Sequence, residues 1–177
     1  MELNHYQANV LKLIFERTGI ERDMDILRFS LAGDFKGQYV IAVSECDVGD
    51  SYIAFNLPSY SSSVFIAITK ADVKLAALIL ANLEDYERET NGVLRLGEAV
   101  IMPNPNNDFE IPYAVLLLRT GTLIDIAEIG DVETISDRET SFFFVVPLDR
   151  DEHDLRATLG HDALLDTFEA QQKDIFL

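Results

Sequence analysis

The sequence has a single cysteine, Cys46, and it has no long uninterrupted run of apolar residues. One cysteine cannot form a disulfide within the chain, and a transmembrane helix needs roughly eighteen or more apolar residues in a row. The first residues also lack the basic stretch followed by an apolar run that marks a secretory signal. These absences favour a reducing, cytoplasmic setting.

Basic residues are also scarce. The chain has 14 Lys and Arg against 31 Asp and Glu, which gives a formal net charge of −17. Such a negative field repels nucleic-acid phosphates and therefore disfavours binding to DNA or RNA. It attracts a basic partner instead, although the same acidity is also explained by the solubility that it gives a small domain.

Sequence motifs of catalysis are missing as well. We find no Gly-x-Ser-x-Gly nucleophile elbow, no phosphate-binding loop and no dinucleotide-binding turn. Carboxylates flank Cys46 and oppose formation of its thiolate. The segment at 151–154 offers metal ligands such as His153, but adjacent helix positions point in different directions. We therefore expect no catalytic residue, no metal site and no cofactor, in a protein that is not an enzyme.

Apolar residues make up 48 % of the 177 residues, which is enough to build the core of one domain. The C-terminal quarter carries the clearest pattern. An aromatic and β-branched run at 142–146, closed by Pro147, is typical of a buried strand. Asp149 and Glu152 have the spacing of a capping box, so we expect a helix that ends near Gly160. A second helix should follow, with Phe168 on its apolar side.

The rest of the chain predicts a sheet and a helical layer. A helix is expected over 4–18, followed by strands over 24–31, 38–44 and 52–57 with short turns, the first at 33–37. Short turns between strands favour an antiparallel meander. A helix that starts at Thr69 or Asp72 and runs to Arg88 is apolar almost all round, so it should be largely buried.

Two further strands are expected at 113–118 and 122–129, and an acidic connection at 131–140 should lead into the last strand. The fold class predicted for residues 1–177 is thus α+β: a single domain with a mixed, mainly antiparallel sheet and flanking helices.

Acidic residues gather in the last third of the chain, between 128 and 139, and four of them form our candidate partner-binding set: Glu128, Asp131, Glu133 and Asp137. A docking surface of this charge would accelerate encounter with a basic protein, whereas solvated loops explain the same residues without any function. The sequence leaves open whether Tyr60, Phe109 and Tyr113 are exposed anchors or core residues.

Two stretches resemble the suppressor of fused domain family, in its bacterial single-domain form. The end of the chain matches that family's strand closing in a proline segment, acidic helix and glycine before a leucine pair, at Val146-Pro147-Leu148, Glu152, Gly160 and Leu164-Leu165. The middle matches its helix, glycine turn, Pro-Asn loop and apolar strand, at 80–83, Gly97, Ile101, Pro103-Asn104 and 114–118.

The resemblance implies a sandwich-like α/β domain that binds proteins. Bacterial domains of this kind look like immunity proteins of toxin systems. We therefore expect a non-enzymatic protein-binding module, an immunity protein that neutralises a cognate toxin by covering it. The alternatives are a small cytoplasmic enzyme, either carboxylate-based or metal-dependent, and a structural homo-oligomer.

Overall fold

The computed structural model describes residues 2–20, 24–31, 38–46, 50–70, 72–103, 111–123, 126 and 128–177. Its helices are α1 (His5–Thr18), α2 (Val73–Thr90), α3 (Arg150–Leu159) and α4 (His161–Gln171), with a short 3₁₀ helix at Thr120–Thr122. Its strands are β1 (Asp25–Phe29), β2 (Tyr39–Cys46), β3 (Ser51–Leu57), β4 (Ser63–Thr69), β5 (Ala99–Ile101), β6 (Ala114–Leu118), β7 (Val132–Ile135) and β8 (Arg138–Leu148).

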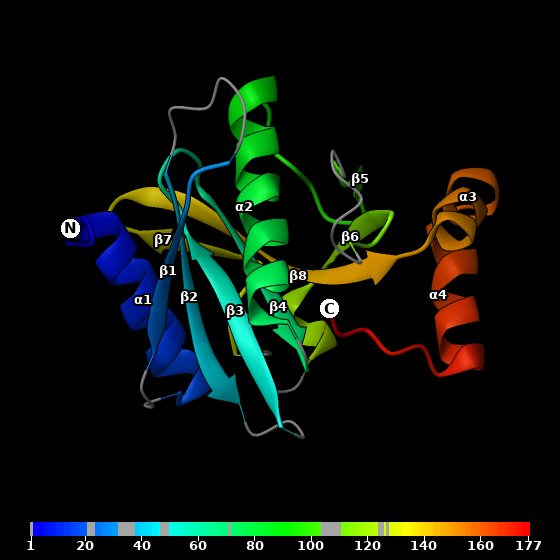
Figure 1. The fold of residues 1–177 in the computed structure, drawn as a ribbon, viewed down its shortest axis with the longest axis horizontal. Helices are drawn as coiled ribbons and strands as arrows, with labels where there is room; N and C mark the ends of the chain where they lie inside the picture. The colour runs from blue at the N-terminus through cyan, green and yellow to red at the C-terminus, as the bar shows by residue number, and fades with distance from the viewer. Residues whose placement is uncertain are drawn as a thin grey trace.

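The strands form one sheet in the order β1-β2-β3-β4-β8-β6-β5, with β7 paired to β8 off this path. The strands β1 to β4 are an antiparallel meander, and only the β4–β8 pair among the described strands is parallel. The predicted α+β class with a mixed, mainly antiparallel sheet is thus confirmed. In Figure 1, β8 runs from the meander across to α3 and α4, which stand beyond the other end of the sheet.

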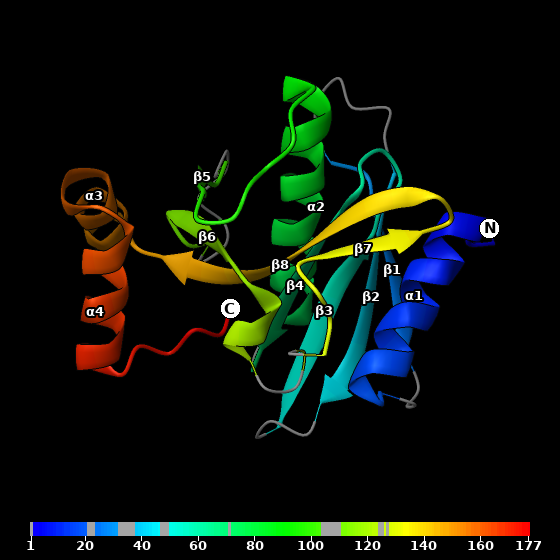
Figure 2. The same cartoon turned by 180° about the vertical axis from the view of Figure 1, so that it is seen from behind.

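Helices cover both faces of the sheet. On one face α2 lies across β3 and β4, as Figure 1 shows, and its apolar residues, among them Leu80 and Leu83, pack on Phe65 and Phe143. On the opposite face, seen in Figure 2, α1 lies over the meander. Residues of α1 and α4, including Ile14 and Phe168, share the core of that face. Two apolar cores therefore sandwich the sheet.

The helix ends follow the sequence closely. Asn4 caps α1 in a capping box with Gln7, and Gly19 ends the helix with a φ of 67°. Asp149 and Glu152 form the predicted capping box of α3. The helix α2 begins after Asp72, whose side chain accepts from two amides of the first turn. These helix starts and stops were predictable because caps satisfy amides that a helix leaves free.

Two predictions for the connections are wrong. The expected strand at 122–129 is absent from the residues described there, because the chain forms a 3₁₀ turn at Thr120–Thr122. The expected acidic connection at 131–140 is instead β7 and the first part of β8. A two-residue turn joins them at Ser136 and Asp137, whose φ values of 51° and 61° are those of a hairpin turn that matches strand twist. The turn predicted at 33–37 lies outside the described residues.

The last strand is also longer than expected. Pro147 does not end β8, because Pro147 lies opposite Val115 and Leu148 lies opposite Ala114. The β4–β8 pairing stops at Phe144, so a proline three residues later removes no ladder hydrogen bond to β4. No helix in the described ranges is long and apolar enough to cross a membrane.

Candidate binding surface at the β5 edge

The last turns of α2 carry three buried carboxylates. Glu84 is fully buried, and its Oε1 accepts from the backbone amides of Ser59 and Tyr60 at 2.6 and 2.8 Å. Its Oε2 accepts from the side-chain Nδ2 of Asn56 at 3.2 Å. Glu87 Oε1 accepts from the Ser63 hydroxyl and from the Leu94 amide, each at 2.8 Å. These side chains therefore tie α2 to the β3–β4 connection and to the segment that follows α2.

Asp85 is the third buried carboxylate, and it accepts a hydrogen bond from the Tyr39 hydroxyl. Arg88 lies 3.5 Å from Asp85 and also stacks over the ring of Tyr60, at 5.2 Å from its centroid. Burial raises the pKa of Tyr39, and the bond to Asp85 raises it further. The group is a closed polar cluster inside the α2 face of the sheet.

Burial also raises the pKa of each of the three carboxyl groups above its ordinary value. The hydrogen bonds that each one accepts act in the opposite direction, because they favour the charged form. A perturbed pKa often marks a catalytic acid, but structural networks produce the same shift. Every hydrogen bond described here joins one of these carboxylates to another group of the same chain. We therefore interpret Glu84, Asp85 and Glu87 as a structural clamp.

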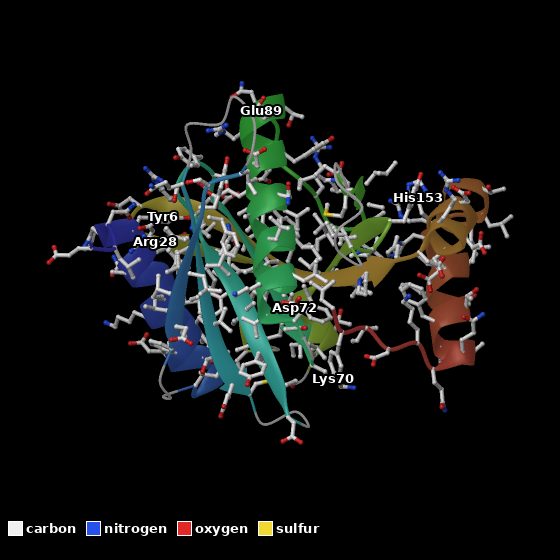
Figure 3. All side chains as sticks on the ribbon, viewed as in Figure 1. Tyr6, Arg28, Lys70, Asp72, Glu89 and His153 are labelled. Atoms are coloured by element: carbon white, nitrogen blue, oxygen red, sulfur yellow. The ribbon has the colours of Figure 1, made fainter. Side chains whose placement is uncertain are left out.

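The clamp fixes the segment between α2 and β5. The Leu94 amide is bound by Glu87, and the Gly92 amide donates to the carbonyl of Glu87 at 3.2 Å. Leu94 is therefore buried, whereas the preceding Val93 is 72 % exposed. Tyr86, on α2, is 47 % exposed. Figure 3 labels Glu89 at this C-terminal end of α2 and Asp72 at its N-terminal end.

The strand β5 is an edge of the sheet, since it pairs only with β6 among the described strands. The Leu117 amide donates to the Glu98 carbonyl, and the Met102 amide donates to the Tyr113 carbonyl. In an antiparallel ladder the bonding direction alternates along a strand. The N–H and C=O groups of Ala99 and Ile101 therefore point away from β6, toward the outside of the sheet.

Apolar side chains stand on both sides of this edge. Val93 and Tyr86 lie on the α2 side and line a groove of about 330 Å³, together with Glu98 and Arg156. Ile101 is 53 % exposed and lies on the other side of the sheet. Its neighbour Val100 points into the α2 core, and successive side chains of a strand point to opposite faces. We call Tyr86, Val93, Glu98 and Ile101 the β5 edge surface.

The predicted acidic residues lie elsewhere, around the β7–β8 hairpin, which Figure 2 shows at the opposite end of the sheet from β5. Glu128 and Asp137 are exposed. Asp131 lies 3.6 Å from Arg119, and Glu133 accepts from the Gly130 amide at 3.1 Å. Asp137 sits in the turn at the far end of β7 from Glu133. Two of the four carboxylates are thus partly engaged within the chain.

The aromatic residues left open by the sequence divide between environments. Tyr60 is 47 % exposed, whereas Tyr113 is half-buried and packs its ring edge-on against His153 at 5.3 Å. Phe109 lies outside the described residues. In the described part of the chain, no three His, Cys, Asp or Glu side chains are grouped to hold a metal ion. His153, labelled in Figure 3, lies 3.3 Å from Asp154.

The β5 edge surface has no clear signal in the sequence. Val93 follows the helix-ending pair Asn91-Gly92, and Ile101 lies two residues before Pro103, so both sit in short apolar segments that read equally well as core. Only the sheet order shows that these segments lie at an edge. The proline after β5 was a usable signal, because prolines favour edge strands.

Three solved structures superimpose on this chain. A SUFU (suppressor of fused protein) homologue from Neisseria gonorrhoeae superimposes with a TM-score of 0.69 at 14 % identity, over 97 % of this chain and 93 % of that one. A chain of the Sufu–Fu complex gives a TM-score of 0.58 at 10 % identity, over 97 % and 85 %. Drosophila Suppressor of Fused gives 0.50 at 10 % identity, over 86 % of this chain and 38 % of that one.

The chain thus has the SUFU-like fold, as its sequence resemblance implied. No family model matches the sequence, and no curated protein matches it either. At these identities the likeness defines the fold alone. What the surface of the fold does has to be argued from its own residues.

Proposed function

We propose that the chain is a non-enzymatic protein-binding module whose partner adds an extended segment along the side of β5 that faces away from β6. The observation that supports this proposal is the outward direction of the Ala99 and Ile101 backbone groups beside exposed apolar side chains. In strand addition, backbone hydrogen bonds provide affinity and side-chain pockets provide selectivity. The β5 edge surface offers both.

The geometry specifies the segment that would fit. β5 has three residues, so the segment needs a core of about three to five residues in extended conformation. Its side chains would alternate between the groove beside Tyr86 and Val93 and the opposite side beside Ile101. The net charge of −17 favours a partner that carries basic residues.

We further propose that this partner is a toxin, which the chain neutralises by covering it. Support comes from the resemblance to bacterial suppressor of fused domains and from the strong negative charge. A protein of the same fold is found in a complex with a second protein, Fu, and this favours binding over chemistry for the present chain. The acidic residues around the β7–β8 hairpin would then steer the basic partner during approach.

The test begins with the chain as bait in a lysate of its source cells, at low and high salt, with captured proteins identified by mass. The purified partner is then titrated against two matched variants, Ile101→Asp and Val132→Asp. Both residues are 53 % exposed, one on β5 and the other on β7. We expect Ile101→Asp to weaken binding about tenfold or more, because it places a charge in an apolar contact. Val132→Asp should not weaken binding.

A third variant addresses the steering. Reversing Glu128, Asp131, Glu133 and Asp137 to Lys should slow association about tenfold at low salt and leave the dissociation rate unchanged. If Val132→Asp weakens binding and Ile101→Asp does not, the interface is the β7–β8 hairpin and the β5 proposal is wrong. Unchanged association in the Lys variant would exclude the acidic residues from steering.

A further inference from the structure

A second hollow lies on the other side of the segment that joins α2 to β5. It is a cavity of about 670 Å³ between the start of α4 and the end of β6. Four of its eight described lining residues are leucines: Leu96, Leu117, Leu118 and Leu165. Its volume falls within the range of about 300 to 1,000 Å³ that is typical of small-molecule sites, which are mostly apolar with a few polar groups.

The polar groups in this cavity are positively charged or able to donate. Arg119 follows β6, and its side chain is 75 % exposed. It lies 3.6 Å from Asp131, but an ion pair this exposed contributes little and leaves the guanidinium available to another anion. An arginine can bind a carboxylate through two parallel hydrogen bonds.

His161 supplies the second group. Its Nδ1 atom is buried and has no hydrogen-bond partner among the described residues. It faces Gly97, another wall residue, since a Cβ built there would lie 4.0 Å from Nδ1. A buried nitrogen without a partner is costly, so the site favours a ligand that supplies one. His161 is also the first residue of α4, where the helix dipole adds partial positive charge.

The described lining of the cavity differs in charge from the chain as a whole. Acidic residues outnumber basic residues by 31 to 14 overall, whereas the described residues that line the cavity include Arg119 and His161 and no Asp or Glu. A neighbouring arginine, Arg156, donates to the carbonyl of Gly97 and holds the wall between this cavity and the groove at β5. An anion that avoids the rest of the surface therefore meets a complementary site here.

We propose that this cavity binds a small amphipathic monocarboxylate, with its aliphatic part against the four leucines and its carboxylate at Arg119 and His161. The apolar wall stabilises the chain of the ligand by removing it from water. The carboxylate satisfies the nitrogen of His161 and competes with Asp131 for Arg119.

Decanoate is the probe for this proposal, and decanol is its uncharged counterpart. Binding is followed by NMR shifts of the His161 imidazole and the leucine methyl groups, and the affinity is measured by calorimetry. We expect saturable one-to-one binding of decanoate, and affinity for decanol that is about tenfold lower or weaker. Arg119→Gln and His161→Gln should each weaken decanoate binding about five- to tenfold and leave decanol binding unchanged.

Two controls make the test decisive. Arg17→Gln removes an exposed arginine from α1, at the opposite end of the molecule in Figure 1, and should not change either affinity. Leu165→Asp places a charge on the leucine wall, leaves Arg119 and His161 in place, and should weaken the binding of both probes about tenfold or more. Thermal melts establish that each variant is folded.

Three results would overturn the proposal. The first is the lack of saturable decanoate binding at the solubility limit. The second is equal affinity for decanoate and decanol, because Arg119 and His161 would then have no role. The third is full decanoate affinity in Leu165→Asp, which would place the ligand elsewhere.

Discussion

The two ends of the sheet differ in how their polar groups are hydrogen-bonded and in how far their apolar side chains are buried. In the meander and α2, Glu84 and Glu87 are buried with hydrogen-bond donors supplied by the fold. Around β5 and α4, Val93 and Ile101 remain exposed, and the Nδ1 atom of His161 is buried without a partner in the described residues. In the first region the buried carboxylates have hydrogen-bond partners. The second region exposes apolar side chains and buries a nitrogen without such a partner, which is typical of surfaces used for binding.

The largest effect that sharpens this comparison is expected at Glu84. Glu84→Ala should lower the free energy of unfolding by about 3 to 5 kcal/mol, because the amides of Ser59 and Tyr60 would be left without an acceptor. Urea unfolding provides the measurement. Glu89→Ala is the matched control in the same helix, since its side chain is 59 % exposed and should contribute less than about 0.5 kcal/mol. Equal losses would contradict a structural clamp.

A smaller effect is expected where α3 and α4 meet. Lys173 lies 2.6 Å from Glu152, and both side chains are largely buried. Lys173→Met should lower the free energy of unfolding by about 1 to 3 kcal/mol, because Glu152 loses its cation but keeps the Asp149 amide. Lys70→Met is the control, since its pair with Asp174 is exposed and worth at most about 1 kcal/mol. Hydrogen exchange should show faster opening of α3 and α4 in Lys173→Met while α2 stays protected. Faster exchange in α2 would mean that the two regions unfold as one unit.

The smallest effect is a pH dependence. Because burial raises the pKa of Glu87 in the folded state, protonation favours folding. This contribution is fully present below the ordinary glutamate pKa of about 4.5 and is lost as the pH rises through the raised value. Glu87→Gln keeps the acceptor oxygen for Ser63 and Leu94 but cannot titrate. Its stability in urea unfolding should therefore fall less steeply than that of the wild-type chain as the pH rises above the ordinary glutamate pKa. Parallel curves would show that Glu87 does not titrate in that range.

Much of the fold could be predicted because its signals are local. The capping box of Asp149 and Glu152 and the glycine after α1 each set a boundary through bonds within a few residues. The β7–β8 hairpin was missed because its turn uses Ser136 and Asp137 with positive φ, without the glycine that usually marks such a turn. Asp131 before β7 and Glu133 within it further hid the alternation of that strand, because they read as an acidic connection.

The candidate sites depend on contacts that no local pattern contains. Glu84, Glu87 and Tyr86 look alike in the sequence, as the polar side of a helix. The two glutamates can be buried because backbone amides of the β3–β4 connection and of Leu94 donate hydrogen bonds to them. What exposes Ile101 is the position of β5 at the end of the sheet order. Both facts belong to the topology.

The parallel pair of β4 and β8 has a consequence for how the chain folds. Ser63 lies opposite Ser141, so β4, the last strand of the meander, cannot gain its second neighbour until the chain has been made at least as far as β8. Pairings between distant residues slow folding, and an open strand edge is prone to aggregation while it waits. We infer that the meander and α2 form first and that β4 stays vulnerable until β8 docks. Pulsed hydrogen exchange during refolding should protect β2 and β3 before the β4–β8 pair, and simultaneous protection would exclude this order.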